Sequence, residues 1–425
     1  MELYERLEKG DNQLTYYSSG MGPFVNPSKK MTAGLLKLKI DNVFETAVVV
    51  FVLYAGHLAH MEACQYHIGS SNGAYEARVL AAMIDTVGLV FPDNEEQVPL
   101  AYELYAASKD APGDRYTQFN ASRVHHVNPI NRTSCFKENF SRRDVKVHFV
   151  GAWDTISSGL FRGLKELPKT RATEHICYFR HALALDERRV RFSLEDIVRP
   201  ASISPSLPPS QPLSPIHEAT PQENDTVLES NVTVGHDQVN PGNRTNDRVK
   251  EVWFAGTHID VSGGGSPHKE ARQSDLNSVL WMATEALAKG LVVDVHKEPK
   301  DASGASTTSK MPLDSLTGAW WLLELVPFIR RRTESDTGLK ALFVACAPHF
   351  GARRVIRPGQ RIHRSAATMV AKDYHPQAAW PSSGDSTLPG TWQQIGDYIS
   401  KKNGDHGALN FDHLIEGEPA SQSEP

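Results

Sequence analysis

The chain has 425 residues, of which 40% are apolar and 22% charged, so it can bury a sizeable core. Its net charge of −5 argues against the basic footprint that nucleic-acid binding requires, and no nucleic-acid partner is expected. The four cysteines include no C-x-x-C pair. This argues against a zinc ribbon or a disulfide-stapled secreted module and favours a reducing compartment.

The N-terminal region has no pattern typical of export, because MELYERLEKG lacks the positive-then-apolar order of a secretory signal. The most apolar stretch, residues 47–58 (AVVVFVLYAGHL), is shorter than the roughly 20 residues of a spanning helix. We therefore predict a buried helix there, no transmembrane segment and a cytoplasmic location.

Short apolar runs alternate with helical patterns along the chain. Residues 64–68 alternate as a strand does, and residues 74–87 follow at helical spacing. Further strands are predicted over residues 145–153 and 251–255, and a helix over residues 276–287. Strands separated by helices predict an α/β fold with a mostly parallel sheet flanked by helices.

Composition predicts how the chain is divided. Residues 198–250 are rich in Pro, Ser, Asn, Thr and Gln, which bury too little apolar surface to offset chain entropy, so a disordered insertion is predicted. Similar composition predicts a flexible loop at 297–310 and a disordered tail at 416–425. The rest of residues 1–415 is predicted to form one domain.

A G-x-S-x-G motif stands where the first predicted strand meets its helix. It consists of Gly69, Ser71 and Gly73. A serine on such a tight turn is exposed as a nucleophile, with a glycine two residues away on either side to relieve crowding. The backbone N–H of Asn72 can then stabilise an oxyanion. We interpret Ser71 as the candidate nucleophile.

A serine nucleophile needs a base that is oriented by an acid, and α/β-hydrolases carry them in the order serine, acid, histidine. Asp154 follows the second predicted strand in GAWDT, and His258 follows the third in WFAGTHID. Functional groups in open parallel sheets come from such strand ends. We therefore predict that Asp154 orients His258 as the base.

Alternatives remain for both partners. His181, in a segment read as a helix or turn, is the alternative base, and Asp260 is an alternative acid or a turn cap. Residues 186–189 (DERR) are interpreted as a salt-bridged, solvated face. No His, Cys or carboxylate cluster predicts a metal site, and no cofactor is expected.

Four segments resemble, in order and spacing, the α/β-hydrolase catalytic domain of type VI secretion phospholipase effectors, and the chain looks most like fungal proteins with this domain. The segments are GSSNGAYEARVLAAMIDTVGL, DVKVHFVGAWDTISS, RHALALDERRVRF and EVWFAGTHIDVSGGG. The resemblance implies Ser71, Asp154 and His258 as catalytic residues and phospholipid acyl esters as substrates. Peripheral membrane contact is compatible with such a substrate.

The resemblance also brings two departures. The family's elbow usually reads Gly-Phe-Ser-Arg-Gly-Ala-Tyr, whereas Ser70 and Asn72 stand here. The family's opening strand, ending in Asp-Gly-Thr, is missing, which implies an N-terminally truncated member with one assured oxyanion donor and weak hydrolysis. The sequence thus predicts a serine esterase, with a catalytically impaired binding or scaffold protein as the alternative. A peptidase or thioesterase on this fold is a third, weaker reading.

Overall fold

The computed structural model describes the parts of the chain in which most predicted elements lie. These are residues 2–10, 13, 15, 17, 65–91, 94–108, 129–156, 167–197, 247–262, 273–294, 314–318, 320–325, 328–331, 344–381, 389, 391–401 and 411–417. The predicted helix at 47–58, the loop at 297–310 and residues 198–246 of the predicted insertion lie outside the described residues. Those three expectations stay predictions.

Strands and helices alternate along the described chain. In order, the elements are α1 (Glu2–Arg6), β1 (Tyr66–Ser70), α3 (Asn72–Val87), β2 (Leu89–Val90), η2 (Glu95–Gln97), α4 (Val98–Ala107), α5 (Pro129–Phe140), β3 (Ser141–Arg142), β4 (Val147–Trp153), β5 (Ile176–Ala184), η6 (Val190–Phe192), β6 (Val249–Phe254), α7 (His258–Val261), α8 (Gln273–Leu287), α9 (Trp320–Glu324), β7 (Phe328–Arg331), β8 (Val344–Ala347), β9 (Arg361–His363), α10 (Arg364–Val370), α11 (Trp392–Lys401), η7 (Asp412–Leu414) and β10 (Ile415–Glu416).

Six of these strands form one sheet in the order β1-β4-β5-β6-β9-β10, and every neighbouring pair in it is parallel. Two small antiparallel pairs, β2 with β3 and β7 with β8, stand apart from it. The predicted α/β class with a mostly parallel sheet flanked by helices is confirmed, and the architecture is consistent with an α/β-hydrolase-like fold. In a parallel sheet all carboxyl ends lie at one edge, where ligands bind in open α/β folds.

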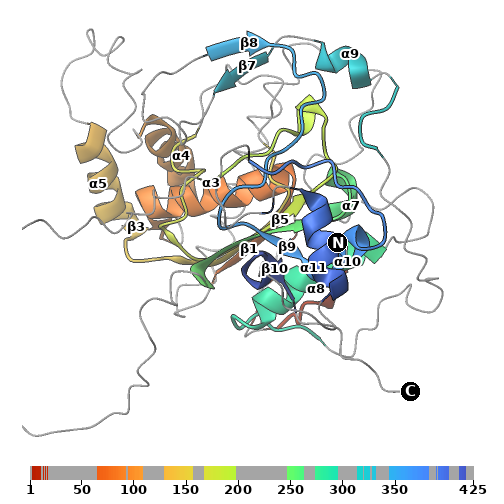
Figure 1. Ribbon diagram of the computed structural model, residues 1–425. Coiled ribbons are helices and arrows are strands. Elements are labelled where there is room, and N and C mark those ends of the chain that lie inside the picture. The colour runs from red at the N-terminus through yellow and green to blue at the C-terminus, as the bar shows by residue number, and fades with distance from the viewer. Residues whose placement is uncertain are drawn as a thin grey trace, which may run out of the picture.

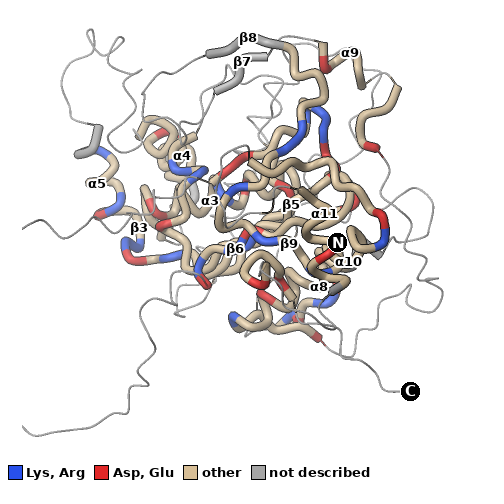
Figure 2. Tube along the Cα trace, viewed as in Figure 1, with Lys and Arg blue, Asp and Glu red and all other residues tan. Residues whose placement is uncertain are grey.

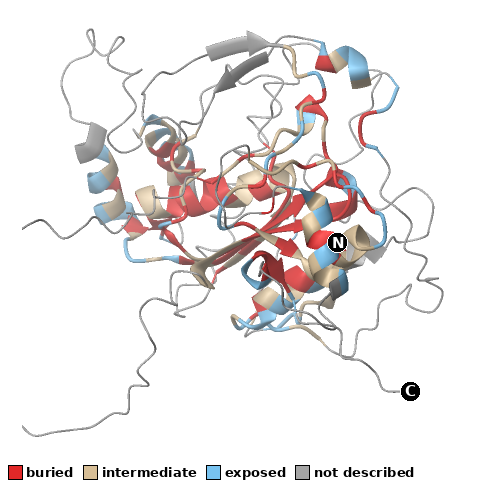
Figure 3. Ribbon diagram, viewed as in Figure 1, coloured by how far each residue is buried: buried red, intermediate tan, exposed pale blue. Residues whose placement is uncertain are grey.

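Helices cover both faces of this sheet (Figure 1). On one face, Val150 and Ala152 of β4 belong to a core that includes α3 and α4. On the other, Phe149 and Trp153 pack with Met282 of α8. Because neighbouring residues of a strand point to opposite faces, β4 is buried on both sides. Figure 3 shows the buried residues concentrated in the sheet and in α3.

A third core cluster lies on the same face of the sheet as α3 and α4, at the end formed by β6, β9 and β10. Trp253 of β6 and Ile362 of β9 pack there with residues of α10, α11 and β10. The C-terminal part of the chain therefore extends the sheet by two strands and buries its own apolar surface against it.

The structure corrects two predicted boundaries and one predicted element. Residues 247–250, assigned to the insertion, are ordered, and Val249 begins β6. Glu416, assigned to the tail, belongs to β10 and pairs with β9. The segment around His181 is strand β5, not a helix or turn. Its sequence, ICYFRHALA, lacks clean alternation because β5 lies between β4 and β6 and is largely buried.

Candidate active site

Ser71 stands alone between the end of β1 and the start of α3. Its backbone has φ 60° and ψ −117°, a conformation that costs a residue with a side chain about 1–3 kcal/mol. The Ser71 N–H donates to the carbonyl of Trp153 at 2.8 Å, which ties the turn to the end of β4. This sharp strand-to-helix turn is the backbone geometry in which hydrolases expose a nucleophile.

The two motif glycines have different roles. A Cβ added to Gly69 would lie 2.3 Å from the carbonyl oxygen of Gly73, so the start of α3 can approach β1 only because Gly69 has no side chain. A Cβ added to Gly73 would meet no atom within 4 Å. The expectation that both glycines relieve crowding therefore holds for Gly69 alone.

Asp154 follows β4 directly and is fully buried, also with a positive φ, of 42°. Its Oδ1 accepts the N–H of Ala184 at 3.1 Å, and its Oδ2 lies 2.7 Å from Nδ1 of His258. Arg354 makes a bidentate contact, with Nη1 2.5 Å from Oδ1 and Nη2 2.9 Å from Oδ2. Burial alone would raise the pKa of Asp154, but the Arg354 charge and the hydrogen bond to His258 outweigh it and hold that pKa well below its usual range.

His258 begins the short helix α7, after β6, and is 5% exposed. Its ring lies over Phe192 of η6, with the centroids 4.7 Å apart. Its backbone N–H donates to Oε2 of Glu187 at 3.2 Å. With Nδ1 directed at Asp154, the geometry assigns the remaining ring nitrogen, Nε2, to any proton transfer with substrate or nucleophile.

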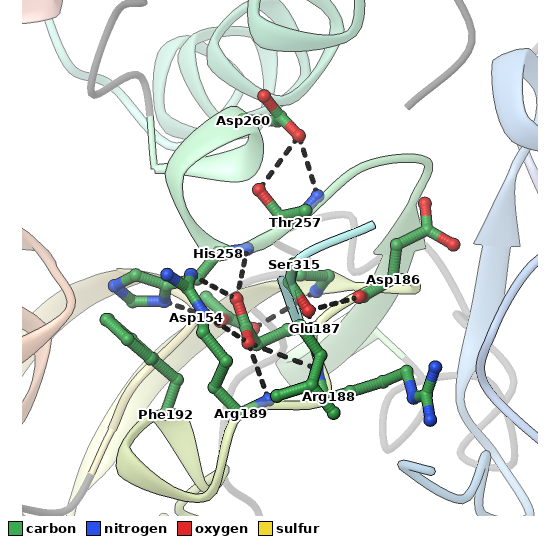
Figure 4. Close-up of polar contacts among 12 residues, drawn as sticks. Asp154, Asp186, Glu187, Arg188, Arg189, Phe192, Thr257, His258, Asp260 and Ser315 are labelled. Atoms are coloured by element: carbon green, nitrogen blue, oxygen red, sulfur yellow. Dashed lines mark hydrogen bonds and ion pairs between the residues drawn. The ribbon is translucent and has the colours of Figure 1, made fainter. Parts of the chain in front are cut away.

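The turn after β5, residues 186–189, lies next to His258 (Figure 4). Glu187 accepts three N–H groups from Arg188 and Arg189 on Oε1, and the Arg189 guanidinium also contacts Oε2 at 2.7 Å. Burial by itself would raise the pKa of Glu187, but the hydrogen bonds and charge of Arg189 lower it. The DERR segment is thus ion-paired as predicted, but the prediction of a solvated face is wrong, since Asp186, Glu187 and Arg189 are buried.

The structure gives the two alternative residues other partners. His181 is fully buried, its Nε2 accepts the N–H of Thr155 at 3.1 Å, and its Nδ1 lies 3.1 Å from Glu251. Both ring nitrogens thus connect neighbouring strands. Asp260 Oδ2 accepts the N–H and the hydroxyl of Thr257, so it caps α7. The alternative roles of His181 as base and Asp260 as acid stay predictions.

Ser71 and His258, both among the described residues, form no hydrogen bond with each other in the structure. Catalytic hydrogen bonds are often long in ligand-free enzymes and tighten in the substrate complex. Asn72 is the first residue of α3, and the first N–H groups of a helix have no partner inside the helix. The oxyanion role of Asn72 therefore stays a prediction that the local geometry suits.

Sequence reasoning missed Arg354. It lies in the segment between β8 and β9, 200 residues from Asp154 along the chain. Nothing local in GARRVIRPG distinguishes it from the neighbouring exposed Arg353. A buried carboxylate needs a counter-ion, but which of 45 Lys and Arg residues supplies it depends on the tertiary fold.

The described part of the chain contains neither a metal-ligand cluster nor a membrane-spanning helix. No group of three or more His, Cys, Asp or Glu residues there could hold a metal ion. No described helix is long and apolar enough to cross a membrane.

Comparison with known proteins supplies the family. Residues 1–285 match the family described as the catalytic domain of Tle1-like phospholipase effectors of the type VI secretion system. The chain belongs to this family. The match confirms the resemblance predicted from the sequence. Membership in the Tle1-like family supports a hydrolase of the lipase or phospholipase type. The match contains Ser71, Asp154 and His258 and ends before Arg354.

The chain is also similar to the uncharacterized protein YEL023C of Saccharomyces cerevisiae. The two are 31% identical over 206 residues, which is 45% of this chain and 29% of the yeast protein. The match therefore spans less than a third of the length of that relative. No solved structure matches the chain significantly.

Proposed function

We propose that the protein hydrolyses carboxylic esters, with phospholipid acyl esters as the substrate class. Ser71 is the nucleophile, His258 the general base and Asp154 the acid that orients His258. The observation that carries this proposal is the 2.7 Å contact between Asp154 and His258, made at the sheet edge where Ser71 lies between β1 and α3. Their strands are not neighbours in the sheet, because β5 lies between β4 and β6.

The proposed reaction follows from these positions. His258 donates its Nδ1 proton in a hydrogen bond to Asp154, so Nε2 is free of a proton and takes the one leaving the Ser71 hydroxyl. The Ser71 oxygen attacks the acyl carbon, and the N–H of Asn72 stabilises the oxyanion that forms. His258 then gives its proton to the leaving alcohol, and water releases the acyl group from Ser71 by the same steps in reverse.

An apolar surface beside His258 supports an acyl substrate. Phe192, which contacts the His258 ring, lies with its ring centroid 6.0 Å from that of Trp320 in α9. Further along α9, Leu322 is 69% exposed, and on the adjoining turn Phe350 is 62% exposed. The Phe350 N–H donates to the carbonyl of Glu324, which holds that turn against α9.

Covalent labelling by a fluorophosphonate probe tests the proposal. We expect the full chain to gain one probe mass and Ser71→Ala to gain none. Ser70→Ala is the matched control, because it removes the neighbouring hydroxyl, and it should label as the wild type does. Labelling of Ser71→Ala at the wild-type level would overturn the nucleophile assignment.

The same experiment separates the alternative, a catalytically impaired hydrolase-fold protein that binds or scaffolds. The lack of a hydrogen bond between Ser71 and His258 in the structure favours that reading. A folded wild-type chain that neither labels nor hydrolyses a short-chain p-nitrophenyl ester would support it.

A further inference from the structure

Arg354 is a charged side chain that four hydrogen bonds hold next to the candidate site. Its guanidinium makes two hydrogen bonds to the Asp154 carboxylate and two more to backbone carbonyls, those of Ala184 at 3.1 Å and Phe192 at 2.8 Å. Its side chain is 9% exposed. These four contacts fix the planar guanidinium in place, and with it the Asp154 carboxylate to which it is hydrogen-bonded.

These contacts join the segments that form the site. Asp154 follows β4, Ala184 ends β5, and Phe192 lies against the His258 ring. Arg354 itself comes from the chain between β8 and β9, so one side chain bridges three segments. Loss of the guanidinium would leave a buried carboxylate and two carbonyls without these donors.

With Arg354 and the Ala184 N–H in place, the Asp154 carboxylate cannot rotate. Oδ1 already accepts two donors, and Oδ2 accepts Arg354 Nη2 while facing His258 Nδ1. A rotated carboxylate would break the bidentate pair. The orientation that Arg354 fixes is therefore the one that holds His258.

We propose that Arg354 is a positioning residue of the candidate active site, which fixes the Asp154 carboxylate toward His258 and opposes proton uptake by the Asp154–His258 pair. This inference rests on the proposed function for its role in catalysis. It adds a residue from outside the family match of residues 1–285.

The second part of the proposal follows from charge. If His258 gains a proton, its Nδ1–H and the Arg354 guanidinium share Oδ2 as two cations, which repel each other. Among the described residues, the charged groups around the pair include Glu187, whose carboxylate accepts the His258 N–H, its partner Arg189, and Asp260 on α7, while Glu187 and Asp196 also act on Arg354. Glu187 is neutralised by Arg189, and Asp260 is bound to Thr257. Arg354 is therefore the cation in direct contact with the pair.

The test is a pair of measurements on the full chain. The ¹H,¹³C imidazole resonance of His258, assigned by its loss in His258→Gln, is followed against pH, and kcat/KM for a short-chain ester is followed over the same range. In Arg354→Met we expect proton uptake by the pair to move to higher pH by roughly one unit, and the acid limb of kcat/KM to move with it. We also expect a loss of kcat of about 10-fold or more from the freed carboxylate.

Two further variants separate charge from position. Arg354→Lys keeps the charge but cannot make the bidentate contact with Asp154. Proton uptake by the Asp154–His258 pair should therefore stay near that of the wild type, while kcat still falls. Arg353→Met, at the exposed neighbouring arginine, should change neither measurement.

A His258 titration in folded Arg354→Met that matches the wild type would overturn the charge part of the proposal. If Arg354→Met does not fold, Arg354→Lys carries the test, and a wild-type kcat in that variant would overturn the positioning part. The resonance measurement needs no turnover. A chain that hydrolyses nothing but shows the shift would therefore refute the proposed function while supporting this inference.

Discussion

The part of the chain that matches the family and the part that follows it contribute differently to the candidate site. Residues 1–285 supply Ser71, Asp154 and His258 at the carboxyl edge of β1, β4 and β6. The described residues of 314–417 supply no candidate for the reaction itself but provide Arg354, which contacts Asp154, and side chains that contact the segments around the site. Figure 2 shows Lys and Arg intermixed with Asp and Glu along both parts in this view.

Side chains of the second part bind the first part through buried polar contacts, and three of them lie around the site. Arg354 grips Asp154, and the Tyr374 hydroxyl donates to Asp186 at 2.5 Å. The carboxylate of Glu324 accepts the N–H of Val190 at 2.6 Å. Part of the support for the site thus comes from outside the matched residues, and a family match to residues 1–285 does not report it.

The largest loss of activity is expected from a substitution in the candidate site within residues 1–285. Asp154→Asn should lower kcat by about 10⁴-fold, because an amide in place of the carboxylate favours the wrong His258 tautomer. Steady-state ester hydrolysis measures this. Asp260→Asn, at the alternative acid, should cost less than about 10-fold, since Asp260 caps α7. Equal losses in the two variants would contradict the assignment of Asp154.

The next effect concerns the connection between the two parts. Glu324→Ala should lower the free energy of unfolding by about 3 kcal/mol, because it strips partners from the buried N–H groups of Val190 and Gly351 and from His349. Urea denaturation measures this. Asp314→Ala, which removes an exposed carboxylate 3.7 Å from Arg188, should change stability by less than about 0.5 kcal/mol.

The free energy of unfolding is expected to change with pH by about 1–2 kcal/mol through Asp186, which contacts Tyr374 of the second part. Burial raises the pKa of Asp186 to about 6 from an ordinary value of 3.8, despite the hydrogen bonds from Tyr374 and Gln377. The folded chain thus binds this proton more tightly than the unfolded chain. The stability from protonated Asp186 is fully present below about pH 4 and is lost as pH rises through about 6.

Unfolding of Asp186→Asn and of the wild type at pH 5 and pH 7 tests this sign. The variant removes the ionisation, so its stability relative to the wild type should increase between pH 5 and pH 7. A relative stability that is constant, or that decreases, across this interval would contradict the raised pKa of Asp186.

The smallest expected effect concerns the exposed surface of α9. Leu322→Asp should lower hydrolysis of phosphatidylcholine vesicles by roughly 3–10-fold while leaving a soluble ester unaffected, because it charges the exposed face of α9 beside the site. Leu287→Asp is the control. Leu287 is 46% exposed at the end of α8, near Lys289, whose carbonyl binds Tyr66 at the opposite edge of the sheet. Equal losses in both variants would contradict a role for α9.

The sequence was sufficient to predict the elements that carry local patterns. The alternation in YHIGS and VHFVGAW indicated β1 and β4, and the strand-to-helix context of Gly69 indicated the turn at Ser71. The positions of Asp154 and His258 after their strands also followed from the pattern. Their contact could be expected because parallel strands end at a common edge.

The remaining features depend on tertiary contacts. Strand β5 was missed because burial on both faces removes the alternation that marks a strand, so the segment around His181 was interpreted as a helix or turn although Arg180 and His181 are fully buried in the sheet. Arg354 and Glu324 could not be found, since a counter-ion from a distant segment leaves no local pattern. The predicted solvated face at Glu187 was wrong for the same reason: its partner Arg189 is local, but the segment that covers it is not.

We expect Ser71, His258 and Asp154 to act as one unit. The most direct measurement is the second-order rate of fluorophosphonate labelling of the full chain, with the modified residue located by peptide mass mapping. We expect the adduct on Ser71 and a rate at least about 10³-fold lower in His258→Gln, because the hydroxyl then has no base. An adduct on another residue, or a wild-type rate in His258→Gln, would contradict the account.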